Sequence, residues 1–196
     1  MIYLLRHGQT DYNREGRLQG QSESQLTELG MAQVQAMADL LKAQIGDEPG
    51  WRIAASPLRR TRQSAEIVAQ TLGLEIEIEP LLIEVGCGVW ENQLYADVRK
   101  AYPTDFAGPG WCFRSPDGER FEHVDDRVRA WLRGLPPEGD RKVIAVAHGI
   151  SGSLLRGAYL GLSSQLTLIQ DMPQDAIFRL TEGRVDRLAC APVIAA

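Results

Sequence analysis

Two short apolar runs in this chain of 196 residues each end in a histidine. Residues 2–5 are apolar and β-forming and stop at Arg6 and His7, while residues 143–147 are equally apolar and stop at His148. Such runs are typical of strands buried on both faces of a parallel sheet. One histidine at a strand end is usually structural, but parallel strands present their carboxyl ends at one edge, where α/β proteins bind ligands. We therefore expect both imidazoles to meet there.

The remaining sequence alternates strand and helix patterns. Apolar residues at helical spacing predict one helix from a Thr27 cap to residue 45, and Ser56 followed by proline predicts a second that ends at Gly73. Two further helices are predicted near residues 124–135 and from residue 150 onward. Other predicted strands cover residues 52–55 and 75–79, and a hairpin covers 176–180 and 185–190. This order predicts an α/β fold with three layers (α/β/α), a mainly parallel central sheet and an antiparallel C-terminal hairpin.

Length and an apolar content of 44% predict a single domain over residues 1–196. Within it, residues 80–122 are irregular and rich in glycine and proline, which is typical of a lid or a binding loop. Trp90, Trp111 and Phe113 in this segment either line a ligand site or belong to the core.

The composition disfavours several classes of partner. A net charge of −5 argues against nucleic acid and anionic membranes. No apolar stretch approaches the roughly 18 residues that span a bilayer, and no secretory leader is visible, so we expect a cytoplasmic protein. Three scattered cysteines, Cys87, Cys112 and Cys190, argue against a disulfide framework or a thiolate metal site. The oligomeric state is left open.

Three arginines stand near the start of the predicted second helix. Arg59, Arg60 and Arg62 follow Ser56, and helix amino termini attract anions. Successive helical residues point about 100° apart, so at most one or two of these side chains can face a site. The alternative is that all three are solvated.

Four segments, in order along the chain, resemble the motifs of a known family. They are Leu-Arg-His-Gly-Gln-Thr at 5–10, Ser-Pro-Leu-Arg-Arg-Thr at 56–61, the segment 82–91 and Val-Ala-His-Gly at 146–149. Together they resemble the histidine phosphatase superfamily, also called phosphoglycerate mutase-like, and in particular its phosphatases. The resemblance covers nearly the whole chain, and four ordered motifs are far more specific than one.

The resemblance implies roles for individual residues. His7 corresponds to the nucleophile that becomes phosphorylated, and Glu84 to the proton donor for the leaving oxygen. The phosphoryl oxygens are implied to be held by Arg6, Arg60 and His148, with Asn13, Gln19 and Gly149 completing the pocket. Without the motif, Glu84 would be interpreted as a solvated carboxylate in a loop. Arg114 and Arg120 are further candidates. Arg120 stands where the family commonly has serine, and both side chains either add positive charge near the substrate or point into solvent.

These roles are chemically coherent. Phosphoryl transfer needs cationic donors around the equatorial oxygens, and two arginines with an imidazole supply that charge, so no metal or cofactor is expected. His7 must attack as a neutral imidazole, which requires its other nitrogen to be held by a hydrogen bond, for example by backbone near Gly8. A carboxyl group can protonate the departing alkoxide and then activate water.

Other reactions fit less well. A cysteine phosphatase needs an arginine six residues after its cysteine, and none of the cysteines has one. Ser151 lies in a near-match to the nucleophile elbow of serine hydrolases, but no histidine follows it to complete the triad. The sequence lacks the histidines and clustered aspartates that a two-metal phosphatase needs. The sequence therefore predicts a metal-independent phosphomonoesterase acting on a small phosphorylated metabolite. The alternatives are a phosphoglycerate mutase, for which the chain is short, and a non-catalytic binding module.

Overall fold

The computed structural model describes residues 1–193, so the last three residues of the predicted domain lie outside it. Its centre is a six-stranded sheet in the order β3-β2-β4-β1-β5-β6. The strands are β1 (Ile2–Arg6), β2 (Arg52–Ala55), β3 (Ile76–Ile78), β4 (Val143–Ala147), β5 (Ala176–Thr181) and β6 (Arg184–Ala189). The first four run parallel, whereas β5 pairs antiparallel with both β1 and β6. The predicted mainly parallel sheet and its C-terminal hairpin are confirmed.

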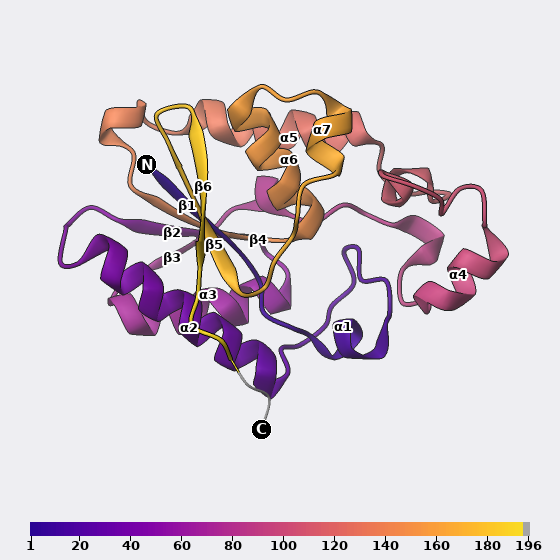
Figure 1. The fold of residues 1–196 in the computed structure, drawn as a ribbon, viewed down its shortest axis with the longest axis horizontal. Helices are drawn as coiled ribbons and strands as arrows, with labels where there is room; N and C mark the ends of the chain where they lie inside the picture. The colour runs from indigo at the N-terminus through magenta and orange to yellow at the C-terminus, as the bar shows by residue number, and fades with distance from the viewer. Residues whose placement is uncertain (194–196) are drawn as a thin grey trace.

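Helices cover both faces of the sheet (Figure 1). One layer holds α2 (Glu28–Ile45) and α3 (Arg59–Leu72), and the other holds α5 (Phe121–Gly134) and α6 (Gly149–Leu160), with α7 (Ser164–Leu168) beside α6. Alternate residues of a strand point to opposite faces. Tyr3 and Leu5 therefore pack in the cluster with α2 and α3, whereas Ile2 and Leu4 pack in the cluster with α5 and α6. Burial on both sides explains why β4, and β1 up to its last residue Arg6, are apolar.

The helix ends agree with the predictions at three positions and differ at one. Thr27 caps α2 by accepting a hydrogen bond from Gly30 N at 3.0 Å, α2 ends at Ile45, and Gly73 ends α3 with φ 69°. The prediction that Ser56 caps α3 is wrong, because α3 begins only at Arg59 and its cap position is Leu58. The Ser56 hydroxyl contacts His148 Nε2 at 2.6 Å instead, and it is therefore engaged at the sheet edge.

Two short helices lie in segments where the sequence shows no apolar periodicity. α1 (Asp11–Glu15) is held by a reciprocal capping box between Thr10 and Asn13. α4 (Tyr95–Ala101) lies within the irregular segment 80–122 and buries Val98 against Leu18 and Trp90. Four short 3₁₀ turns complete the structure: Pro80–Leu82, Gly88–Trp90, Trp111–Arg114 and Glu138–Asp140. Within residues 1–193, no helix has the length and apolar character that crossing a membrane requires.

The start of α2 packs directly on the backbone that follows β1. A Cβ atom on Gly30 would lie 2.0 Å from Gln9 O, and one on Gly8 would lie 2.1 Å from Gly30 O. Gly30→Ala should therefore lower the free energy of unfolding by about 1–3 kcal/mol, because the backbone has to move to make room for the methyl group. Gly139→Ala is the matched control, since nothing lies within 4 Å of a Cβ there. Urea denaturation of both variants measures the effect, and equal losses would contradict this packing.

Candidate active site

The two histidines that end β1 and β4 meet at the carboxyl edge of the sheet. Their strands are parallel neighbours, and the ring centroids of His7 and His148 lie 5.3 Å apart in an edge-on arrangement. Each residue is only 2% exposed. The amino-terminal end of α3 reaches the same place through Arg60, which is also buried. The structure thus brings together the three strand and helix ends that the sequence predicts to converge.

His7 is held as a neutral imidazole with one nitrogen free. Its Nδ1 lies 2.8 Å from the carbonyl oxygen of Gly8, so Nδ1 carries the proton and donates it. The remaining nitrogen, Nε2, then has an unshared electron pair. Burial, and after it the charges of Arg60 and Arg6, lower the pKa of His7 well below its usual value of 6.5. The expected backbone restraint near Gly8 is confirmed, and Nε2 is the ring nitrogen that this contact leaves free.

His148 is fixed through both of its ring nitrogens. Arg60 Nε donates to His148 Nδ1 at 3.2 Å, so the proton of the neutral ring must be on Nε2, which donates to Ser56 Oγ at 2.6 Å. Burial and the charge of Arg60 lower the pKa of His148 well below 6.5. Ser56 therefore sets the orientation of this ring, a contact that its sequence position before a proline did not reveal.

Two buried guanidinium groups supply the positive charge. Arg60 also donates to the carbonyls of Ser22 at 2.8 Å and Gly20 at 2.7 Å, which leaves two of its five N–H donors. Arg6 donates to Met172 O at 2.6 Å, and its buried Nε has no partner. Burial lowers the pKa of Arg60 to about 10, still well above neutrality. Unpaired cationic donors in a buried site favour an anionic ligand.

Glu84 lies across the cavity at the start of α6. Its Oε1 accepts from Ser151 N at 2.9 Å and Val85 N at 3.0 Å, and its Oε2 accepts from Ile150 N at 3.1 Å. The carboxylate therefore caps α6, where the helix dipole favours negative charge. Oε2 accepts only one of these bonds and so retains a lone pair that can take a proton. The Glu84 side chain is therefore half-buried and held in a fixed orientation on the cavity wall.

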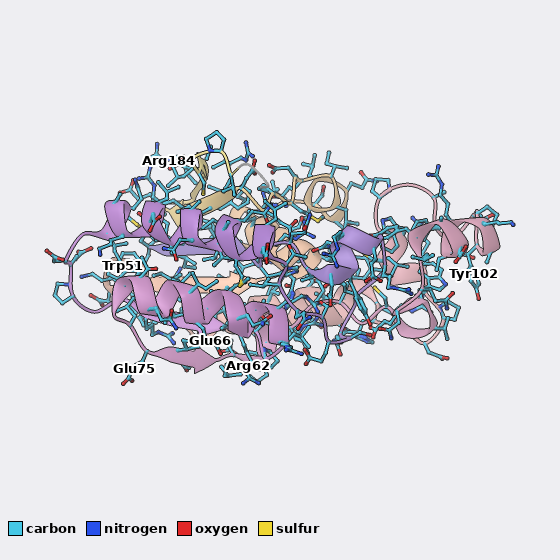
Figure 2. All side chains as sticks on the ribbon, turned by 90° about the horizontal axis from the view of Figure 1, so that it is seen from below. Trp51, Arg62, Glu66, Glu75, Tyr102 and Arg184 are labelled. Atoms are coloured by element: carbon cyan, nitrogen blue, oxygen red, sulfur yellow. The ribbon has the colours of Figure 1, made fainter. Side chains whose placement is uncertain are left out.

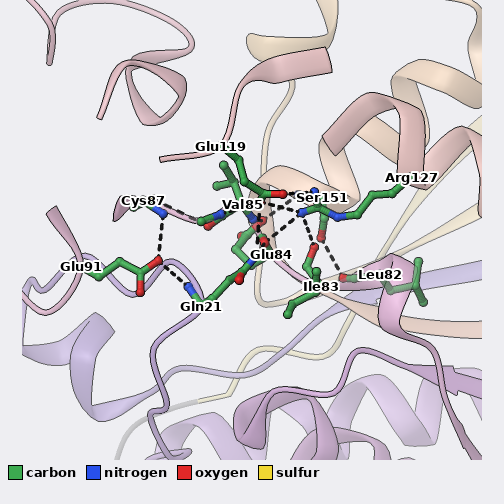
Figure 3. A network of polar contacts seen from close by, with 11 residues as sticks. Gln21, Leu82, Ile83, Glu84, Val85, Cys87, Glu91, Glu119, Arg127 and Ser151 are labelled. Atoms are coloured by element: carbon green, nitrogen blue, oxygen red, sulfur yellow. Dashed lines mark hydrogen bonds and ion pairs between the residues drawn. The ribbon is translucent and has the colours of Figure 1, made fainter. Parts of the chain in front are cut away.

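An ion pair between Arg127 and Glu119 fixes the backbone around Glu84 (Figure 3). Arg127 donates to the carbonyls of Ile83 and Glu84, both at 2.9 Å, and binds Glu119 at 2.7 Å. Glu119 in turn accepts from Gly86 N at 2.7 Å. The sequence drew attention to Arg120 in this segment, but its neighbour Glu119 is the residue that joins the network.

A cavity of about 300 Å³ opens between Arg6, Arg60 and Glu84, and neither His7 nor His148 is among the residues that line it. Of the residues predicted for the site, it is lined by Arg6, Gln19, Arg60, Glu84 and Gly149. The oxygen of Gln19 accepts from Thr10 and Ser24, which leaves its amide nitrogen to donate. Asn13 stands behind this lining, where its oxygen accepts from Thr10 and Gln174.

At Gly149 the start of α6 lies close to the side chain of Arg6. A Cβ atom there would lie 3.2 Å from Met172 Sδ and 3.5 Å from Arg6 Cζ. Glycine therefore lets the start of α6 lie against the guanidinium. Gln174 and Met172, which contact His7 and Arg6, come from the loop before β5, and no sequence motif pointed to them.

Several candidates lie away from the cavity. Arg114 is exposed and donates to the carbonyls of Asp105, Ala107 and Pro109, and Arg120 is exposed with one contact to Phe113 O at 3.4 Å. Neither lines the cavity, so neither adds charge to it in this structure. Arg62 points outward from α3 (Figure 2), and Arg59 is exposed as well.

The aromatic residues of the segment 80–122 divide between core and site. Trp90 is fully buried, and Phe113 packs on Phe121 with ring centroids 5.4 Å apart. Trp111 lines the cavity, together with Tyr95. The sequence could not separate these alternatives, since both need an apolar ring.

The two buried histidines should make stability depend on pH. In the unfolded chain each histidine takes up a proton as the pH falls through about 6.5, whereas the lowered pKa values keep both rings neutral in the folded state. Stability is therefore present above about pH 6.5 and is lost on acidification, by up to about 1.4 kcal/mol per pH unit for each ring. Urea denaturation between pH 7 and 5.5 measures this slope. His7→Gln should remove the contribution of His7 to this slope. An unchanged slope would contradict the conclusion that His7 is neutral in the folded protein.

Comparison with known proteins gives a consistent family. The model of the histidine phosphatase superfamily (branch 1) matches residues 2–183. The chain is 39% identical over 168 residues to the probable phosphoglycerate mutase GpmB of Photorhabdus laumondii, a match that covers 82% of this chain and 75% of that protein. A mycobacterial glucosyl-3-phosphoglycerate phosphatase superposes with a TM-score of 0.78 at 29% identity, covering 97% of this chain and 98% of that one.

A putative alpha-ribazole-5'-P phosphatase from Escherichia coli has the same fold, with a TM-score of 0.77 at 22% identity over 100% of this chain and 98% of that one. The family model and the sequence relatives agree with the family that the four motifs indicate, and the solved structures agree with the fold. The chain belongs to the histidine phosphatase superfamily.

Proposed function

We propose that this protein is a phosphomonoesterase that hydrolyses a small phosphorylated metabolite through a phosphohistidine and needs no metal ion. The observation that carries the proposal is the state of His7. Its Nδ1 is tied to Gly8 O, its Nε2 is free, and its neutral form is favoured beside two arginines that retain free donors. A neutral nucleophile surrounded by cationic donors is what attack on a phosphate dianion requires.

The first step forms a bond from His7 Nε2 to phosphorus and breaks the bond to the ester oxygen. Arg6 and Arg60 stabilise the charge on the transferred group, and Glu84 gives its proton to the departing oxygen. In the second step the Glu84 carboxylate takes a proton from water, whose oxygen attacks phosphorus. The N–P bond breaks, its electron pair returns to Nε2, and inorganic phosphate leaves.

The name of the sequence relatives makes a phosphoglycerate mutase the second candidate. A mutase returns the phosphoryl group to an organic acceptor, whereas a phosphatase passes it to water. The glucosyl-3-phosphoglycerate phosphatase that shares the fold supports transfer to water on this scaffold. The two candidates differ in product, which makes them separable in one assay.

The experiment is a phosphate-release assay with 4-nitrophenyl phosphate in excess EDTA, alongside 3-phosphoglycerate followed by chromatography. We expect hydrolysis that chelation does not diminish, and no 2-phosphoglycerate. Strict dependence on an added metal would contradict the mechanism, and isomerisation of 3-phosphoglycerate that outpaces phosphate release would favour the mutase.

A further inference from the structure

We propose that the substrate carries no anion other than its phosphoryl group, and that its leaving group is apolar. This inference rests on the proposed function, and it specifies which phosphomonoesters the cavity accepts. It depends on the chemistry of the cavity walls rather than on the catalytic residues.

Most of the cavity wall away from the catalytic groups is apolar. Side chains of this kind come from the loop after α1, from the segment 80–122, from α6 and from the loop before β5: Leu18, Val85, Tyr95, Trp111, Ile150 and Met172. The rings of Tyr95 and Trp111 lie edge-on, with centroids 5.4 Å apart. Cys112 lines the wall too, and burial raises its pKa to about 12, so the thiol is neutral. Such a wall suits a ring or a branched alkyl group.

Arg6 and Arg60 are the only cationic side chains among the described residues that line this cavity. Other nearby arginines are engaged elsewhere: Arg114 by the carbonyls of residues 105–109, and Arg127 by Glu119 and the backbone at Glu84. Arg99 lines a separate depression that shares only Tyr95 and Trp111 with the cavity.

The charges in the cavity are therefore matched to one phosphoryl group. The two guanidinium charges balance the two charges of a phosphate dianion when Glu84 holds the proton that it donates, so no positive charge is left for another anion. A second carboxylate or phosphate on the leaving group would lie against apolar walls without a cationic partner, which is costly. A phosphoglycerate brings such a carboxylate, and the site therefore disfavours it.

The test compares benzyl phosphate with 4-carboxybenzyl phosphate, two esters that differ by a single carboxylate far from the reacting oxygen. We expect kcat/KM for benzyl phosphate to be at least about tenfold higher. Equal values, or a preference for the carboxylated ester, would overturn the inference while leaving phosphatase activity established.

A gain of charge gives a sharper test. Tyr95 lines the cavity at its rim and is 43% exposed, so Tyr95→Arg should be tolerated and should bring a third cation to the cavity. We expect it to reduce the discrimination between the two esters by about tenfold. Leu166→Arg is the control, because Leu166 is 52% exposed on α7 and does not line the cavity, and it should keep the discrimination of the parent. A Tyr95→Arg enzyme with the parent's discrimination would count against the inference.

Binding of the matched phosphonates, benzylphosphonate and 4-carboxybenzylphosphonate, separates this inference from the proposed chemistry. Calorimetry should show tighter binding of benzylphosphonate to the parent protein. If neither ester is hydrolysed but this order of binding holds, the proposed function fails and the inference about the cavity stands. Equal binding of the two phosphonates would overturn the inference whatever the catalytic result.

Discussion

Replacing His7 with alanine is expected to lower kcat for a phosphomonoester by at least about 10⁴-fold, because no other side chain can take the place of its free Nε2. The ring at position 148 cannot substitute, since both of its nitrogens are engaged by Arg60 and Ser56. Steady-state release of phosphate measures the loss.

His123→Ala is the matched control for this variant. His123 is exposed on α5, away from the cavity, and its replacement should leave kcat within about twofold. The His7→Ala protein should still bind inorganic phosphate, since Arg6 and Arg60 keep their donors. A His7→Ala enzyme with more than a few per cent of the parent's activity would place the nucleophile elsewhere.

Replacing Glu84 with glutamine should lower kcat for an alkyl phosphate by about 10²–10⁴-fold, the usual contribution of general acid catalysis. Glutamine keeps the shape but cannot give a proton to a departing alkoxide. It also replaces one carboxylate oxygen at the start of α6 by an N–H₂ group, so stability should fall by about 0.5–2 kcal/mol. Thermal denaturation beside the kinetics separates the two effects.

The leaving group distinguishes an acid from a merely structural residue. 4-Nitrophenolate needs no proton to depart, so Glu84→Gln should still release one equivalent of it rapidly and then turn over slowly, because hydrolysis of the phosphohistidine lacks its base. Benzyl phosphate should show no such burst. Equal slowing of the first turnover for both esters would contradict the acid role.

The sequence predicts well which strands and helix position the site. Strands buried on both faces must be apolar, and parallel strands must present their carboxyl ends at one edge of the sheet. His7, His148 and the start of α3 meet for that reason. The backbone bond that holds His7 follows from the chemistry of the nucleophile and could be anticipated before the structure.

What the sequence could not predict are contacts between distant loops. Ser56 looks like a helix cap until β4 places His148 beside it, and Met172 and Gln174 reach Arg6 and His7 across more than 160 residues. Arg120 was a candidate because of its positive charge, yet Arg127 on α5 binds the backbone at Glu84, and Glu119 is its ion-pair partner. Neighbouring side chains of one loop point in different directions, and only the packed structure decides which of them faces the site.

The direct test of the central claim is the chemistry of the trapped intermediate. Glu84→Gln protein is mixed with 4-nitrophenyl phosphate, quenched in alkali during the burst, digested and mapped by mass spectrometry. The account predicts about one phosphoryl group per chain on His7, stable in alkali and lost in acid, as expected for a phosphoramidate. A phosphoryl group on any other residue, or a burst of 4-nitrophenolate without phosphorylated protein, would contradict it.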